Sequence, residues 1–170
     1  GVVFALATAI RALTQPGDAV LIQPPVYYPF YNVVRNNGRK LVENPLVERD
    51  GKFEIDFDDL EAKLRIESVT MLLLCSPHNP VCRVWTADEL RRVGDLCQKY
   101  GVFVVSDEIH CDFAFPEHPH TMFLQANPHL SHQAMVCTAP SKTFNLAGLQ
   151  ASNIWIPGAV ARGKFDAELD

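Results

Sequence analysis

The sequence predicts an α/β fold, a three-layer sandwich in which helices cover both faces of a mostly parallel central sheet. Two observations lead to this prediction. Segments with strand and helix patterns alternate along the 170 residues without an internal repeat, a low-complexity tract or a long flexible linker. The central strand-like segments, 69–75 and 102–105, are apolar at nearly every position rather than at alternate positions. Such continuous apolarity is typical of strands that are buried on both faces.

Turn and capping residues divide the first half of the chain into short elements. Gln15-Pro-Gly-Asp18 stops the first helical pattern, and Asn37-Gly38 closes the second with a pair that tolerates a left-handed backbone. Asp56 is placed to cap a third helix, with Asp59 adding negative charge near its positive end. The predicted elements are a helix over 1–13, a strand over 19–23, a helix over 27–36, a strand over 39–43, a helix over 57–64 and a strand over 69–75.

The second half of the chain has equally clear signals. Thr86 followed by Glu89 is a capping-box pattern that opens a helix, and Gly101 ends that helix. Pro157 is suited to the first turn of a further helix. The predicted elements are a helix from 86 to 100, strands over 102–106, 134–138 and 152–156, and a helix beginning at 157.

Composition excludes several classes of function. A formal net charge of −5 and a pI near 5.6 argue against a nucleic-acid partner, since phosphates call for clustered Lys and Arg. No apolar run approaches the roughly 20 residues of a membrane helix. Residues 1–11 lack the basic region of a signal peptide, so we expect no membrane association and a cytoplasmic protein.

The five cysteines are odd in number, widely spaced and without a C-x-x-C pair. This pattern favours reduced, buried thiols over a disulfide framework. Cys75 and Cys82 flank His78, but the intervening prolines and the lack of a second pair argue against a metal site. We therefore expect no metal.

Polar residues follow three of the predicted strands at the point where each strand ends. The segments are Leu74-Cys-Ser-Pro-His-Asn-Pro80, Val105-Ser-Asp-Glu-Ile-His110 and Cys137-Thr-Ala-Pro-Ser-Lys-Thr-Phe-Asn145. Each alone is ordinary turn or cap chemistry. Because ligands bind beyond the carboxyl ends of strands in α/β sheets, the three together predict a ligand site at that edge.

These segments, together with Gln23-Pro-Pro-Val-Tyr-Tyr-Pro-Phe30, resemble the cofactor site of fold-type I pyridoxal-phosphate (PLP) enzymes, the aminotransferase class I and II superfamily. The resemblance covers essentially the whole chain. Within the superfamily, Ser76-Pro-His-Asn-Pro-Val81 and Ala139-Pro-Ser-Lys-Thr-Phe-Asn-Leu-Ala-Gly148 look most like the carbon–sulfur lyase branch known as the MalY/PatB group. The resemblance implies PLP as the cofactor.

Lys142 is the candidate for holding the cofactor aldehyde as a Schiff base. An amine on a Ser-Lys-Thr loop after a strand suits that role when its ammonium is desolvated. PLP works as an electron sink when its ring nitrogen is protonated, which a carboxylate against that nitrogen favours. Asp107 matches the family position for this carboxylate, and Glu108 is the neighbouring alternative.

The resemblance implies further cofactor contacts. Asn79 matches the asparagine that hydrogen-bonds the phenolic oxygen of the cofactor, and His110 falls near the same oxygen. Tyr27 matches the aromatic residue that stacks on the pyridine ring, with Tyr28 as the alternative. His78 is left out of the site, because a histidine in a turn is usually solvated or capping.

The cofactor phosphate calls for N–H donors at a helix N-terminus. The resemblance gives this role to the main-chain amides of Val2 and Val3, and Ser141 adds a hydroxyl. Two positions depart from the family pattern. Ala139 stands where relatives often have Ser, and Gln150 where many aminotransferases have Arg, while Thr138 is placed to compensate.

The resemblance also implies a domain organisation and a reaction. Residues 1–170 match the central part of the PLP-binding large domain, with the N-terminal arm and the C-terminal small domain absent, so this piece is not expected to turn over substrate alone. Relatives are homodimers. The expected reaction is cleavage of cysteine S-conjugates to pyruvate, ammonia and a thiol. The alternatives are an aminotransferase acting on an amino-acid substrate at the same site, and a non-catalytic PLP-binding module or fragment.

Overall fold

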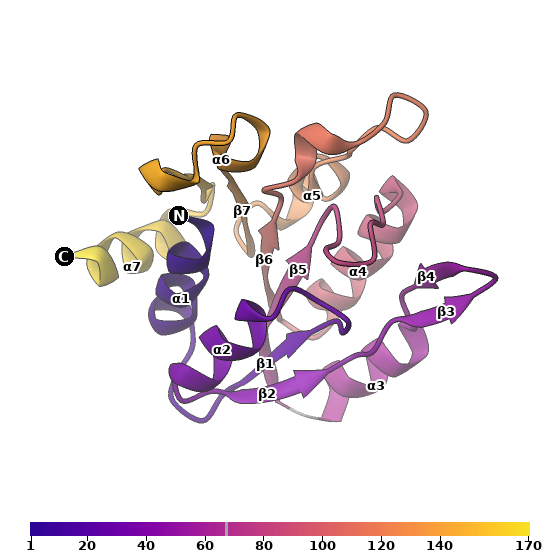
Figure 1. Ribbon diagram of the computed structural model, residues 1–170. Coiled ribbons are helices and arrows are strands. Elements are labelled where there is room, and N and C mark those ends of the chain that lie inside the picture. The colour runs from indigo at the N-terminus through magenta and orange to yellow at the C-terminus, as the bar shows by residue number, and fades with distance from the viewer. Residues whose placement is uncertain (67) are drawn as a thin grey trace.

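The computed structural model describes residues 1–66 and 68–170 and has a six-stranded sheet at its centre (Figure 1). The strand order is β2-β1-β5-β6-β7-β8. The first five of these strands are parallel, and β8 pairs antiparallel with β7, which confirms the mostly parallel sheet. The strands are β1 (Ala19–Ile22), β2 (Lys40–Glu43), β5 (Val69–Cys75), β6 (Phe103–Asp107), β7 (Ala134–Thr138) and β8 (Asn153–Trp155).

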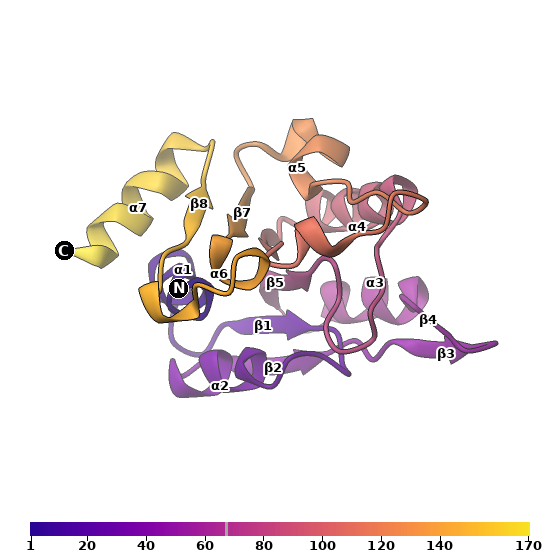
Figure 2. The ribbon, with the colours of Figure 1, turned by 45° about the horizontal axis from the view of Figure 1, so that its top comes forward.

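Helices cover both faces of this sheet, as predicted (Figures 1 and 2). One face carries α1 (Val2–Leu13), α2 (Pro29–Asn36) and α7 (Ala159–Leu169), and the other carries α3 (Phe57–Ile66), α4 (Ala87–Lys99) and α5 (Phe123–Ala126). Successive strand residues point to opposite cores, so that Val105 packs in the first and Val104 in the second. Both positions must be apolar, which explains the continuous apolar runs in the sequence.

The predicted helix caps form. The Thr86 hydroxyl accepts a hydrogen bond from the Glu89 N–H at 3.2 Å, and the Glu89 carboxylate accepts one from the Thr86 N–H at 2.8 Å. The Asp56 carboxylate accepts from the Asp59 N–H at 3.0 Å at the start of α3. Gly101, with φ of +68°, follows the end of α4. The capping signals therefore located the beginnings of α3 and α4 correctly.

Most predicted boundaries shift by one or two residues, and three of these shifts have a clear cause or consequence. The second helix begins at Pro29 rather than Tyr27, because the Tyr27 N–H donates to the Asn79 carbonyl (3.0 Å) and proline suits a first helical turn. Strand β6 runs one residue later than predicted and includes Asp107. Helix α7 begins at Ala159, with Gly158 in an extended conformation at its N-cap, rather than at Pro157.

A small hairpin and several short helices were not predicted. The hairpin pairs β3 (Val47–Arg49) with β4 (Lys52–Glu54) around Asp50 and Gly51, whose φ values of +50° and +75° suit a tight hairpin turn. The short helices are η1 (Cys111–Phe113), α5 (Phe123–Ala126), η2 (Pro128–Leu130), α6 (Pro140–Thr143) and η3 (Ala147–Leu149).

All five cysteines are free thiols. Cys75, Cys97 and Cys137 are buried as expected, Cys111 is partly buried, and Cys82 is exposed, contrary to the prediction. Cys82 is exposed because it lies in the loop after β5 rather than in an apolar element.

In the part of the chain that the structure describes, no helix has both the length and the apolarity to cross a membrane. The same residues contain no cluster of three His, Cys, Asp or Glu side chains suited to a metal ion.

Candidate active site

A small cavity of about 90 Å³ lies at the carboxyl edge of the sheet. Seven of the eight residues predicted to bind the cofactor line it, and Ser141 is the one that does not. The lining residues are Val2, Val3, Tyr27, Cys75, Asn79, Asp107, Ile109, His110 and Lys142. They come from the start of α1, the approach to α2, the ends of β5 and β6, and α6. The fold therefore brings together residues that are up to 140 positions apart in the chain.

Asp107 is the last residue of β6, and its carboxyl group is almost fully buried. Its Oδ1 accepts a hydrogen bond from the Ile109 N–H at 3.2 Å. Burial raises the pKa of this carboxyl to about 7, an effect that the nearby Glu108 increases and that the Ile109 N–H and the Lys142 charge oppose. A cationic group placed in the cavity would therefore favour the ionised form of Asp107.

Glu108, the neighbouring alternative, points away from this cavity. One carboxylate oxygen accepts from the Ser106 hydroxyl (2.9 Å) and the Phe123 N–H (2.8 Å), and the other lies 2.6 Å from His120 Nε2. Glu108 thus joins the end of β6 to α5 and to the segment between them. Since adjacent strand residues face opposite sides, only Asp107 faces the cavity.

Lys142 lies on α6, which follows β7 directly, and its side chain is exposed in this chain. The neighbouring Thr143 hydroxyl donates to the Asp112 carboxylate at 2.6 Å, which ties α6 to the segment after β6. Ser141 occupies the same helix but is outside the cavity lining. The position of the lysine therefore depends on a contact between two loops that follow adjacent strands.

Asn79 and Tyr27 are held together by the backbone. The Asn79 carbonyl accepts from the Tyr27 N–H, and the Asn79 N–H donates to the Cys75 thiol at 3.4 Å. No hydrogen bond of the Asn79 side chain is found within the described part of the chain, which leaves its amide free for a ligand. Of the two candidate tyrosines, Tyr27 lines the cavity and Tyr28 does not. Their rings meet edge to face with centroids 5.3 Å apart.

His110 precedes η1 and is half-buried at the rim of the cavity. Burial lowers its pKa, and the Lys142 charge lowers it further. The imidazole ring packs against Phe113, with centroids 6.0 Å apart. We therefore expect a neutral His110, which is able to donate or accept one hydrogen bond toward the cavity.

The start of α1, where the sequence predicts an anion site, borders the cavity. Backbone N–H groups in the first turn of a helix have no partner within the helix. Val2 is buried and Val3 is 38% exposed, and both line the cavity. The Gly1 nitrogen donates to the Gln150 carbonyl at 2.6 Å, so that the start of α1 lies against the segment that follows Lys142.

The side chains around this anion site differ from the family pattern in the way that the sequence indicated. Ala139 is buried and has no hydroxyl to offer. Thr138 is half-buried, and its Oγ1 accepts from the Asn153 side chain at 3.4 Å. Neither lines the cavity, whereas Val2 and Val3 do, so the first turn of α1 is the part of this lining whose main-chain N–H groups could receive an anion.

Cys75 and Ile109 line the cavity but were not predicted. Burial, and then the nearby Asp107 charge, raise the pKa of the Cys75 thiol to about 12. This thiol is therefore neutral and unreactive at physiological pH. Cys75 could have been predicted from its position as the last residue of β5, because the ends of the parallel strands meet at this edge of the sheet.

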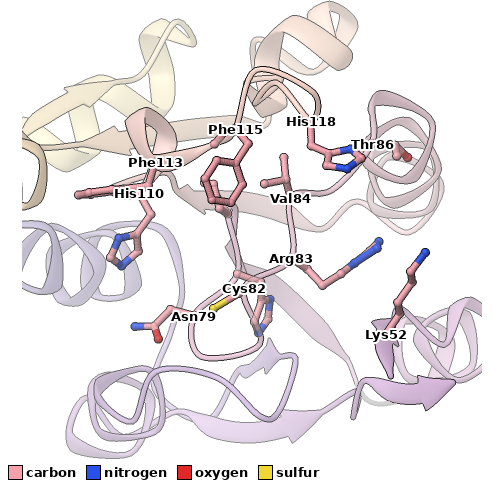
Figure 3. Close-up of a pocket in the computed structure, with 13 residues that line it drawn as sticks. Lys52, Asn79, Cys82, Arg83, Val84, Thr86, His110, Phe113, Phe115 and His118 are labelled. Carbon is pink, nitrogen blue, oxygen red and sulfur yellow. The ribbon is translucent and has the colours of Figure 1, made fainter. Parts of the chain in front are cut away.

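A larger pocket of about 630 Å³ adjoins the cavity and shares Asn79 and His110 with it (Figure 3). Its wall includes Phe113 and Phe115 from the segment after β6. His78, which sequence reasoning left out of the site, lines this pocket. Burial lowers the pKa of His78 to about 4, so its ring is neutral, and its Nε2 lies 3.0 Å from the Pro25 carbonyl oxygen.

Comparison with known proteins agrees with this geometry. The chain is 53% identical over 169 residues to cystathionine beta-lyase PatB of Bacillus subtilis (strain 168), covering 99% of this chain and 44% of that protein. The crystal structure of cystalysin from Treponema denticola, which contains a pyridoxal 5'-phosphate cofactor, matches with a TM-score of 0.97 and 45% identity over 100% of this chain and 43% of that one.

A PLP-bound C-S lyase from Staphylococcus hominis, complexed with the inhibitor L-cycloserine, matches with a TM-score of 0.95 and 34% identity, covering 98% of this chain and 42% of that one. The chain thus spans less than half the length of these relatives. The family model for aminotransferase class I and II matches residues 1–162. With this match along nearly its whole length, and with seven of the predicted residues gathered around one cavity at the sheet edge, the chain belongs to the aminotransferase class I and II family.

Proposed function

We propose that this chain forms the cofactor-binding centre of a PLP-dependent carbon–sulfur β-lyase that cleaves cysteine S-conjugates, with water, to pyruvate, ammonia and a thiol. The observation that carries the proposal is the single cavity at the sheet edge, where Lys142, Asp107, Asn79 and Tyr27 meet the start of α1. The likeness to a cystathionine beta-lyase, to cystalysin and to a C-S lyase structure supports the choice of reaction.

The groups in the cavity fit PLP. Asp107 is a buried carboxylate that accepts one hydrogen bond from the described residues, from the Ile109 N–H, and a protonated ring nitrogen would supply a second donor. The first-turn amides of α1 suit a phosphate. The unbonded Asn79 amide suits a phenolic oxygen, and Lys142 supplies the amine for a covalent link to the aldehyde. When bound, PLP supplies an electron sink for negative charge at the α-carbon of the substrate.

Each residue then has a defined task. Asp107 would stabilise positive charge on the ring nitrogen, and its burial would strengthen that interaction. Asn79 would donate a hydrogen bond from its side-chain amide, and His110 lies beside it. Tyr27 would contact the pyridine ring. Lys142 would hold the cofactor through Nζ, and the same amine, when free, would act as the general base toward the α-proton of the substrate.

The same proposal extends to domains, assembly and location. We propose that residues 1–170 are the central part of a PLP-binding large domain that works with an N-terminal arm and a C-terminal small domain in a homodimer. Exposed apolar side chains near the cavity, Val3, Phe4, Phe144 and Leu149, support an interface there. The five free thiols support a reducing, cytoplasmic setting.

The test is cofactor retention. The chain is incubated with PLP, freed of excess cofactor, and examined by absorbance. Borohydride reduction and peptide mass mapping then locate the modified residue. We expect a visible band and a modification at Lys142, both lost in Lys142→Ala and both kept in Lys164→Ala, a matched change on exposed α7. Well-folded protein that retains no cofactor overturns the proposal.

The reaction class needs a second assay on a protein that retains the cofactor. Release of pyruvate and a thiol from a cysteine S-conjugate supports the lyase. Transfer of the amino group to a 2-oxo acid without thiol release supports the aminotransferase alternative instead.

A further inference from the structure

We propose that the larger pocket, lined by residues 52, 77–79, 82–84, 86, 110, 113–115 and 118, binds the sulfur substituent of the substrate and selects an apolar, aryl-sized group that ends in a carboxylate. This inference rests on the proposed function, because it names the substrate class of the same site. The location, the size and the charge of the pocket all point to such a substituent.

The larger pocket lies where the sulfur substituent of a bound substrate would extend. The pocket shares Asn79 and His110 with the cofactor cavity, so a molecule held at the cavity has open space beside it. In Figure 3, Asn79 and His110 lie on one side of the pocket, Lys52 lies on the opposite side, and the Phe115 ring is between them. A substituent extending from the cavity would therefore pass the aromatic wall before it reaches Lys52.

The size exceeds what a small amino acid needs. At about 630 Å³, the pocket is in the range of roughly 300–1,000 Å³ that is typical of sites for drug-sized ligands. Phe113 and Phe115 are 56% and 73% exposed, so much of their ring surface is available to a ligand. Burying such aromatic faces is favourable, which suits a ligand with an apolar body.

The charges are of one sign. Among the described residues that line the pocket, none is Asp or Glu, whereas Lys52 and Arg83 are cationic. This contrasts with the formal net charge of −5 on the chain. The Arg83 charge is already matched, because its guanidinium pairs with Glu89 and lies over the Trp85 ring, 4.7 Å from the centroid.

Lys52 is different. It begins β4 in the hairpin and is exposed, and no ion pair of its side chain is found in the described part of the chain. Its ammonium is therefore available to a carboxylate on the ligand. The lining offers no carboxylate for a ligand ammonium, so an acidic end is preferred over a basic one.

Buried contacts of Glu108 hold the segment that carries Phe113 and Phe115. The Glu108 carboxylate accepts a hydrogen bond from the Phe123 N–H and contacts the His120 ring. These contacts join the two ends of the segment between β6 and α5. Both Glu108 and the His120 side chain are buried. The aromatic wall is thus held by a buried contact rather than by surface packing alone.

The experiment measures binding of three small thioethers by calorimetry: para-(methylthio)benzoate, the neutral para-(methylthio)benzamide and the cationic para-(methylthio)benzylamine. We expect the benzoate to bind most tightly. Lys52→Gln should weaken the benzoate by about threefold to fivefold, the size of an exposed ion pair, and leave the benzamide unchanged. The loss should shrink at high salt. Lys52→Arg should restore binding, and Lys164→Gln is the control.

A second variant tests the aromatic wall. Phe115→Ala should weaken the benzoate and the benzamide alike, by about fivefold, because it removes one aromatic contact of about 1 kcal/mol. Equal binding of all three probes, or binding that Lys52→Gln and Phe115→Ala leave intact, overturns the inference.

The link to the cofactor is tested on PLP-loaded protein. S-(para-carboxybenzyl)-L-cysteine should change the visible spectrum at a lower concentration than S-benzyl-L-cysteine, and this difference should disappear in Lys52→Gln. If cofactor is retained but the difference is absent, the inference fails and the proposed function stands. If folded protein retains no cofactor, the proposed function fails first, whatever the thioethers do.

Discussion

Gly94 of α4 packs directly against Asn127 in the segment after α5, and replacing it with alanine should destabilise the fold. A Cβ added there would lie 2.1 Å from Asn127 Oδ1 and 2.5 Å from its Cγ. Asn127 is buried and has little room to move, because its side-chain nitrogen donates to the Leu90 carbonyl (3.0 Å) and the Phe123 carbonyl (3.2 Å).

The magnitude follows from three contributions. Overpacking costs about 2 kcal/mol, and the two hydrogen bonds that Asn127 must give up contribute about 1 kcal/mol each. The better helix propensity of alanine returns about 1 kcal/mol. The free energy of unfolding should therefore fall by about 3 kcal/mol for Gly94→Ala, measured by urea unfolding followed by circular dichroism.

Gly163 provides the matched control, because it lies inside α7 and a Cβ there meets nothing within 4 Å. Gly163→Ala should stabilise the protein by up to about 1 kcal/mol. In an Asn127→Ala background, the cost of Gly94→Ala should largely disappear. The reasoning is refuted if Gly94→Ala is neutral on its own, or costs as much with Asn127 removed as with Asn127 present.

Three further predictions concern single side chains. In the cofactor-free chain, the free energy of unfolding should fall as pH rises from about 4 to about 7, because folded Asp107, whose pKa is raised to about 7, keeps a proton that the unfolded chain has released. Asp107→Asn should flatten this fall in urea titrations across that range, and an unchanged slope would contradict the burial argument. Cys82 has a φ of +56°, so Cys82→Gly should raise stability by about 1 kcal/mol in urea unfolding, whereas Cys82→Ala should not. Thr86→Ala should lower the free energy of unfolding by about 1 kcal/mol through loss of the capping box, whereas Thr86→Ser should retain most of the stability. Equal losses for both variants would argue against a role for the hydroxyl.

The fold was largely predictable because its signals are local. Val69–Cys75 and the neighbouring central strands are apolar on both faces, and the Thr86 and Asp56 caps mark helix starts within one turn. The hairpin was missed because its strands have three residues each and bury little, so no clear alternation arises. The start of α2 was misplaced because the Tyr27 N–H bonds to Asn79, a contact 52 positions away.

The candidate site was predictable to the extent that its residues follow strands directly. Asn79, Asp107 and Lys142 each come shortly after or at the end of a strand, and parallel strands deliver them to one edge. The larger pocket was not predictable, because its wall depends on how residues 111–122 fold back. That return is fixed by the buried contact between Glu108 and His120, two residues in segments with no periodic pattern.

The antiparallel direction of β8 has a consequence for the lysine segment. Thr138 at the end of β7 lies opposite Asn153 at the start of β8, so residues 139–152 leave the sheet and rejoin it at the same place. Residues 139–152 therefore form a loop whose two ends are held together by strand pairing. It can be lengthened, shortened or exchanged as one cassette while every strand keeps its register. A family that shares this arrangement is able to vary the surroundings of the residue at position 142 without rebuilding the scaffold beneath it.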